Sequence, residues 1–222
     1  MSTPNFDNIA EGRAKFEKFV AQVGTTITSL GGPAATPEDL AAMARTKAVA
    51  FFWLERWETS FAAFLAREAG NSDIQTLNGY RLLKLHHIAF GIFIEVDHSE
   101  GEASWAKFTS RLKAVVDLAD EILQGTPRRS VGLQAPQEPY VSSSMGLAEP
   151  LYQTVSRCAD PEIVERARGL MAKLPASDGA NSAWRMAYVE KILSACTGKP
   201  YIEGDSTSAT PMDASAGSSV AG

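Results

Sequence analysis

Three histidines are the side chains in this sequence that could most readily do chemistry: His86, His87 and His98. Imidazole titrates near neutral pH, so a histidine can bind a metal ion or transfer a proton. On a helix, His86 and His87 point about 100° apart, which prevents them from readily chelating one ion together. The sequence contains no His-Glu-x-x-His motif. We therefore predict histidines that are hydrogen-bonded or packed in the core, with a ligand or proton-transfer role as the alternative.

The acidic and thiol side chains form no recognisable metal or catalytic motif. The acidic residues between 95 and 102 lack the alternating ligands and central glycine of a calcium loop, so we interpret them as a solvated helix end. Two cysteines, Cys158 and Cys196, are too few for a zinc cluster or a disulfide scaffold, and we predict buried structural thiols. No phosphate-binding glycine loop or nucleophile elbow is present. We predict no metal and no cofactor.

Two predicted helices carry the rings that could line a ligand site. The candidates share aromatic or imidazole rings at helical spacing: Trp53, Trp57, Phe61, His86, His87 and Phe90. Aromatic rows at this spacing more often belong to a core, which is the simpler interpretation. In the alternative, the rings bound an apolar cavity between two helices, and a flat or cationic ligand lies between them.

Hydrophobic periodicity predicts the elements that must position these residues. Helical patterns cover seven segments and no span alternates as a strand: residues 6–20, 37–69, 73–96, 102–123, 144–157, 161–173 and 177–198. Thr36-Pro37, Asp73 or Ser72, and Asp160-Pro161 are typical helix starts. The sequence thus predicts an all-α fold, an orthogonal or hairpin array of about seven helices.

The distribution of apolar residues indicates how these helices are organised. We predict an N-terminal helix and linker at 1–35, a helical domain at 36–202 with a mobile loop at 125–144, and a disordered tail at 203–222. Residues 86–96 are apolar on nearly every side, which places this helix at the centre of the domain. The predicted inward face of residues 37–69 includes Leu40, Phe51 and Trp57.

Composition and charge narrow the classes of function. The 222 residues carry a formal net charge of -5, which repels a phosphate backbone and disfavours nucleic-acid binding. The most apolar stretch, residues 88–96, is far shorter than the roughly 20 residues of a membrane helix. We therefore expect a soluble intracellular protein, nuclear or cytoplasmic, that contacts neither membrane nor nucleic acid directly.

A more specific pattern occupies residues 149–175. It consists of Glu149-Pro150-Leu151-Tyr152, Arg157-Cys158-x-Asp160-Pro161-x-Ile163, Ala167, Leu170 and Leu174-Pro175. This pattern resembles the C-terminal regulatory region of fungal binuclear zinc-cluster transcription factors. A looser similarity extends over residues 40–200, where 48–65 resembles the family's tryptophan-containing helix and 82–94 its central helix. The family's basic pair before a glycine is replaced here by residues 176–181.

The resemblance implies a regulatory or interaction domain that acts in transcription through a protein partner or a small hydrophobic ligand. The family's cysteine-rich DNA-binding module is missing from this sequence, so we expect either a fragment of a longer regulator or, as the favoured alternative, a free-standing regulatory domain, in both cases without DNA contact by this chain. A homodimer, or a dimer with a full-length regulator, is compatible with that role. The alternative is a cofactor-independent enzyme of the cyclase or isomerase type, acting on a hydrophobic metabolite of fungal secondary metabolism. His86 or His87 would then be its acid or base.

Overall fold

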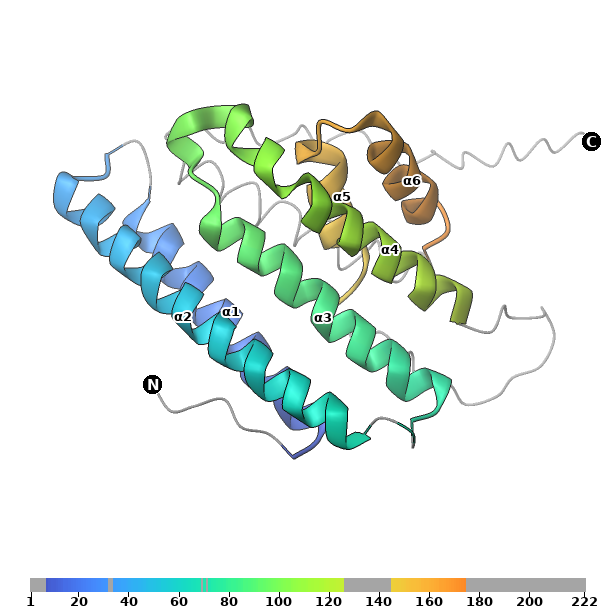
Figure 1. The fold of residues 1–222 in the computed structure, drawn as a ribbon. Coiled ribbons are helices and arrows are strands. Elements are labelled where there is room, and N and C mark those ends of the chain that lie inside the picture. Colours follow the sequence, from blue (N-terminus) through green and yellow to red (C-terminus); the bar gives the residue numbers. More distant parts are fainter. Residues whose placement is uncertain (1–6, 32–33, 69, 71, 126–144, 175–222) are drawn as a thin grey trace, which may run out of the picture.

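The computed structural model describes residues 7–31, 34–68, 70, 72–125 and 145–174 (Figure 1). In this part of the chain all regular structure is helical, which confirms the predicted all-α class. The elements are α1 (Ile9–Leu30), α2 (Pro37–Glu68), α3 (Ile74–Glu95), the 3-10 segment η1 (His98–Phe108), α4 (Thr109–Gly125), α5 (Ala148–Arg157) and α6 (Pro161–Met171). Six α-helices are thus described, not seven. The predicted helix at 177–198, the tail at 203–222 and nearly all of the predicted loop lie outside the described residues.

The predicted helix starts are confirmed by side-chain caps. Thr36 and Asp39 form a reciprocal pair at the start of α2, in which the Asp39 amide donates to Thr36 Oγ1 and the Thr36 amide donates to Asp39 Oδ2. Asp73 accepts from the Thr76 amide before α3. Asp160 accepts from two amides of α6, which has proline in its first turn. These caps satisfy amides that have no partner within the helix.

Two predicted boundaries are wrong. The first helix does not end near residue 20 but continues to Leu30, because Val23 and Ile27 extend its buried stripe and Gly24 is buried within the helix without ending it. The fourth helix does not begin at 102, because residues 98–108 form 3-10 turns around Gly101. The φ of Gly101 is 64°, a conformation that favours glycine and interrupts the helix.

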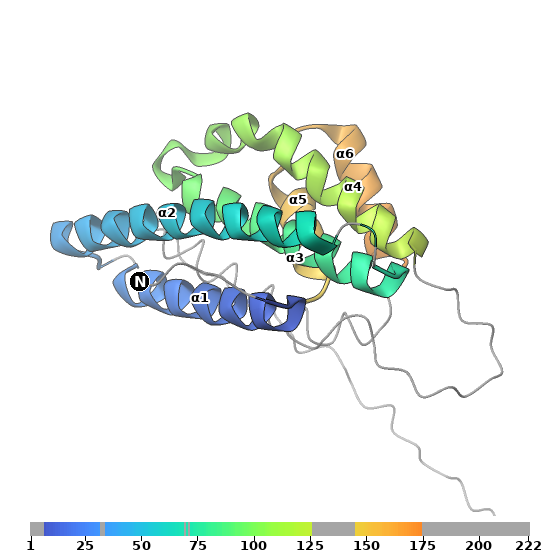
Figure 2. The same cartoon turned by 60° about the horizontal axis from the view of Figure 1, so that its bottom comes forward.

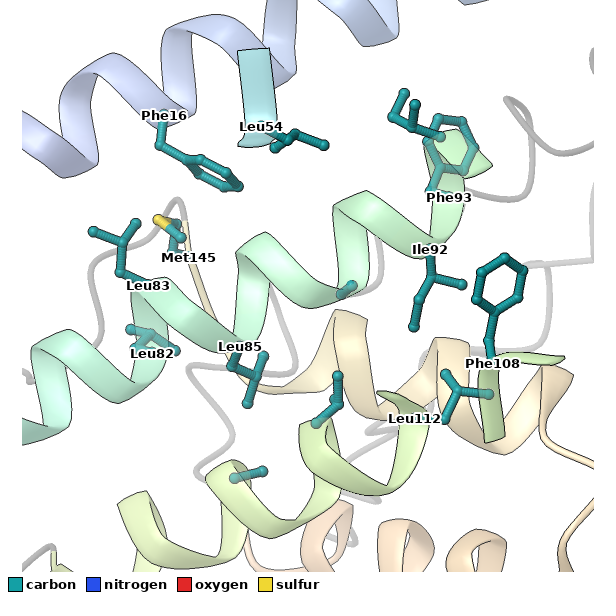
Figure 3. Packing of buried hydrophobic residues seen from close by; sticks show 14 of the residues in the cluster. Phe16, Leu54, Leu82, Leu83, Leu85, Ile92, Phe93, Phe108, Leu112 and Met145 are labelled. Atoms are coloured by element: carbon teal, nitrogen blue, oxygen red, sulfur yellow. The ribbon is translucent and has the colours of Figure 1, made fainter. Parts of the chain in front are cut away.

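Helix α3 lies at the centre, as its apolar sequence predicts. The hairpin of α1 and α2 packs on one side of α3, whereas α4 and the α5–α6 hairpin lie on the other side (Figures 1 and 2). Figure 3 shows Leu83 pointing toward Phe16 of α1, while Leu85 and Ile92 point toward Leu112 and α4. A helix packed between two layers needs apolar residues on both faces, and α3 has them. The core of α1 is continuous with that of the other helices.

Candidate functional site

The predicted ring residues converge on the interface between α1, α2 and α3. We name this group the aromatic cluster; it consists of Phe16, Phe19, Trp53, Trp57, Phe61, His87 and Phe90. Trp53, Trp57 and Phe61 come from α2, and His87 and Phe90 from α3, as predicted from their spacing. Sequence reasoning missed Phe16 and Phe19, which α1 contributes. Their spacing of three residues on one helical face was the available signal.

Trp57 is the centre of the aromatic cluster. Its ring is stacked on that of Phe61, with centroids 4.7 Å apart, and on the imidazole of His87, with centroids 4.9 Å apart. The ring of Phe16 packs against the ring of Trp57, with centroids 5.3 Å apart. The Trp57 residue is 0% exposed. Contacts at these distances are those of a packed core, in which the rings fill the space between the helices themselves.

Trp53 and Phe90 extend the same packing toward α1. The Trp53 ring is stacked on Phe19 with centroids 3.8 Å apart and an interplanar angle of 14°. Phe90 meets Phe16 and Phe19 edge-on, at 6.4 and 6.1 Å. Edge-on and stacked arrangements are the favoured geometries of aromatic pairs. The aromatic cluster therefore fixes the positions of α1 and α2 against α3.

His87 combines ring stacking with polar contacts. Its Nε2 lies 3.1 Å from the Leu54 carbonyl oxygen, which can only accept, so Nε2 carries the proton and donates. Its Nδ1 lies 3.4 Å from Glu58 Oε2, and the other carboxylate oxygen of Glu58 accepts from Lys84. Burial lowers the pKa of His87 below its ordinary value, opposed by the Leu54 carbonyl and by the charge of Glu58. The folded protein thus favours the neutral imidazole.

This preference predicts a pH dependence of stability. Because the pKa of His87 is lower in the folded than in the unfolded chain, the unfolded chain binds the proton more strongly. The neutral imidazole of His87 therefore contributes fully to the free energy of unfolding above about pH 6.5. This contribution is lost as the pH falls from there through the pKa that His87 has in the folded chain. The charged groups around the imidazole are Glu58 of α2, Lys84 of α3 and Arg111 of α4.

Urea unfolding at about pH 7.5, 6.5 and 5.5 measures the effect, which reaches at most about 1.4 kcal/mol per pH unit for one proton. The matched variant is His87→Phe, which keeps a ring on Trp57 but cannot titrate. We expect a smaller loss of stability on acidification in His87→Phe than in the wild-type protein. Identical slopes would show that His87 has no part in the pH dependence.

His86 points to a different part of the molecule. Its Nε2 donates to the Gly146 carbonyl oxygen at 2.8 Å, which ties α3 to the segment before α5. His86 is buried, and His87 is mostly so. The pair therefore diverges, as the 100° angle between neighbouring helical residues predicts, and each imidazole is hydrogen-bonded. The two histidines do not form one site.

The other candidate groups have structural surroundings. Glu95, from the acidic group at 95–102, accepts from Arg111 of α4, so it is ion-paired rather than simply solvated. Cys158 is half-buried at the end of α5, and its amide donates to the Thr154 carbonyl. Cys196 lies outside the described residues.

Within the described ranges, no group of three or more histidine, cysteine, aspartate or glutamate side chains could hold a metal ion. None of the helices described is long and apolar enough to cross a membrane.

The outward face of α2 is a second candidate site, and sequence reasoning missed it. Leu40 and Phe51, predicted to face inward, are 54% and 40% exposed, and Val49 and Phe52 are 51% and 58% exposed. Residues 49–54 are all apolar, but a helix packed on one side can bury only part of such a run. Four of the six large hydrophobic side chains exposed on the described part of the chain lie on α2. Such a concentration is typical of a binding surface.

Comparison with protein-family models, with curated proteins and with solved structures yields no match for this chain.

Proposed function

We propose that this chain is a regulatory interaction domain that acts in transcription by binding another protein through the outward face of α2, without contacting DNA itself. The observation that carries this proposal is the exposure of Val49, Phe51 and Phe52 on one helix of an otherwise well-buried core. The resemblance of residues 149–175 to the regulatory region of zinc-cluster transcription factors supplies the context. The net charge of -5 agrees with a domain that binds protein rather than nucleic acid.

The packing of the aromatic cluster supports an interaction domain over a pocket for a small ligand. Trp57 is in ring contact with Phe16, Phe61 and His87, so these rings occupy the region where a cavity was one alternative. In this proposal the tryptophans have a structural role, and most of the large apolar side chains that are exposed on the described part of the chain lie on the other side of α2.

The enzyme of the cyclase or isomerase type is the second candidate function. The lowered pKa of His87 favours it, because perturbed histidines are common at active sites. However, the ring of His87 is stacked on Trp57, and its two nitrogens face Leu54 and Glu58. His86 is engaged by Gly146. A substrate would have to displace these contacts, so we place this candidate behind the interaction domain.

A reporter assay in a fungal cell tests the proposal. The full chain is fused to an unrelated DNA-binding domain upstream of a reporter gene, and we expect it to change transcription several-fold. Phe52→Glu places a charge in the middle of the α2 face and should abolish the change. The matched control Leu77→Glu alters another exposed hydrophobic residue, on α3, and should retain it. A well-expressed fusion that leaves transcription unchanged would contradict the proposed function.

A further inference from the structure

We propose that the partner of the α2 face is a second copy of this chain, bound through an antiparallel pair of α2 helices. This inference rests on the proposed function, because it names the partner for the same surface. It is carried by the arrangement of apolar and charged side chains along the exposed side of α2.

The exposed side of α2 has the periodicity of a helix that packs against another helix. Two rows of exposed residues repeat at seven-residue spacing: Ala41, Ala48, Glu55 and Ala62, and Arg45, Phe52, Thr59 and Ala66. The rows lie opposite the buried stripe that includes Met43, Ala50 and Trp57. A spacing of seven residues keeps a seam facing a partner helix over several turns. The ring contacts of Trp53 and Trp57 place α1 and α3 on that buried side of α2, and Figure 2 shows α1 running alongside α2.

The apolar residues set the register of the pair. Phe52 is the most exposed large hydrophobic side chain on α2, and Ala48 lies one turn before it on the same face. In an antiparallel pair related by two-fold symmetry, Phe52 of each copy packs over the partner's Ala48, where a small side chain leaves room for the ring. Val49 and Phe51 flank this contact. The guanidinium of Arg56 lies 5.6 Å from the centroid of the Phe52 ring and stays at the rim.

The charges along α2 favour this antiparallel register over a parallel pair of α2 helices related by two-fold symmetry. Arg45 lies three residues before Ala48, and Glu55 lies three residues after Phe52. The register that places Phe52 over the partner's Ala48 therefore places Arg45 opposite the partner's Glu55, twice by symmetry. A parallel pair would bring Arg45 against the partner's Arg45. Neither Arg45 nor Glu55 takes part in the ion pairs found among the described residues. Complementary charges of this kind fix partner orientation.

The two charges cannot satisfy each other within one copy. They are ten residues apart on a continuous helix, which corresponds to about 15 Å along the axis. A charge exchange between positions 45 and 55 therefore tests contact between copies without creating or removing a contact between these two side chains inside the monomer. This property makes the charge pair a sharper probe than Phe52 alone.

Sedimentation equilibrium of the purified full chain over a range of concentrations tests the inference. We expect the wild-type protein to form a dimer, and Arg45→Glu and Glu55→Arg each to raise the dissociation constant by about tenfold or more. The double variant Arg45→Glu/Glu55→Arg should restore dimerisation. The control Arg168→Glu makes the same change of charge on an exposed side chain of α6 and should leave the dimer intact. Circular dichroism verifies that each variant is folded.

Each other outcome has a defined meaning. A wild-type protein that stays monomeric at all concentrations would overturn the inference, as would a dimer that neither single variant weakens. A double variant as weak as the single variants would exclude the antiparallel register. In all three cases a reporter response that depends on Phe52 would leave the proposed function standing, with another partner or another arrangement of the two copies. A dimer with an inactive reporter fusion would overturn the function alone.

Discussion

Replacement of Trp57 by alanine is expected to lower the free energy of unfolding by about 3–5 kcal/mol, the largest effect of a single substitution in the aromatic cluster. Trp57 is 0% exposed and contacts rings from α1, α2 and α3. Alanine removes these contacts and leaves a cavity that three packed helices can fill only partly. Urea or thermal unfolding monitored by circular dichroism at neutral pH measures the loss.

Phe52→Ala is the matched control, because Phe52 lies five residues away on the same helix but is 58% exposed. We expect this variant to change the stability of the monomer by no more than about 0.5 kcal/mol. The comparison also separates a core residue from a ligand-binding one. If Trp57→Ala left stability nearly unchanged and instead abolished binding of a co-purified small molecule, the aromatic cluster would be a binding site and the core interpretation would be wrong.

The parts of the fold that the sequence predicts correctly are those that depend on local chemistry. Asp73 and Asp160 cap helices because their side chains reach amides two or three residues away. Residues 86–96 are apolar all round, and only a position between two layers accommodates such a helix. The divergence of His86 and His87 follows from helical geometry alone.

The parts that it misses depend on how one helix is rotated against another. Residues 49–54 are equally apolar, so periodicity does not say which of them face the core. Which residues face the core is decided by α1, whose Phe16 packs against Trp57 and whose Phe19 packs against Trp53. Because these contacts hold the tryptophans inward, Phe52 faces outward. The rotation of α2 about its own axis therefore has two consequences. It brings the tryptophans against α1, and it leaves the opposite face of α2 exposed.

This link gives the aromatic cluster a place in the proposed function. The rings of α1 and α3 hold one side of α2, and α2 presents the other side to a partner. A rigid helix loses little conformational freedom on binding, so its exposed apolar residues contribute more of their burial to affinity. Substitutions inside the cluster should therefore weaken a partner contact only indirectly, in proportion to the unfolded fraction.

Replacement of Leu151 by alanine is the second large effect that we expect, a loss of about 2–5 kcal/mol in the free energy of unfolding. Leu151 belongs to the pattern at residues 149–175, is 0% exposed, and lies on α5, which packs against both α4 and α6. The pattern residues Ile163, Ala167 and Leu170 of α6 are buried in the same core. The pattern is then explained by the packing of the α5–α6 hairpin.

Val155→Ala is the matched control, because Val155 lies one turn later on α5 and is only partly buried. It should destabilise the protein clearly less than Leu151→Ala in the same urea titration. If the two variants lost equal stability, burial on α5 would not explain the difference between the positions. If Leu151→Ala were as stable as the wild-type protein and yet inactive in the reporter assay, Leu151 would contribute to function directly, and the pattern at 149–175 would be a contact site rather than a packing motif.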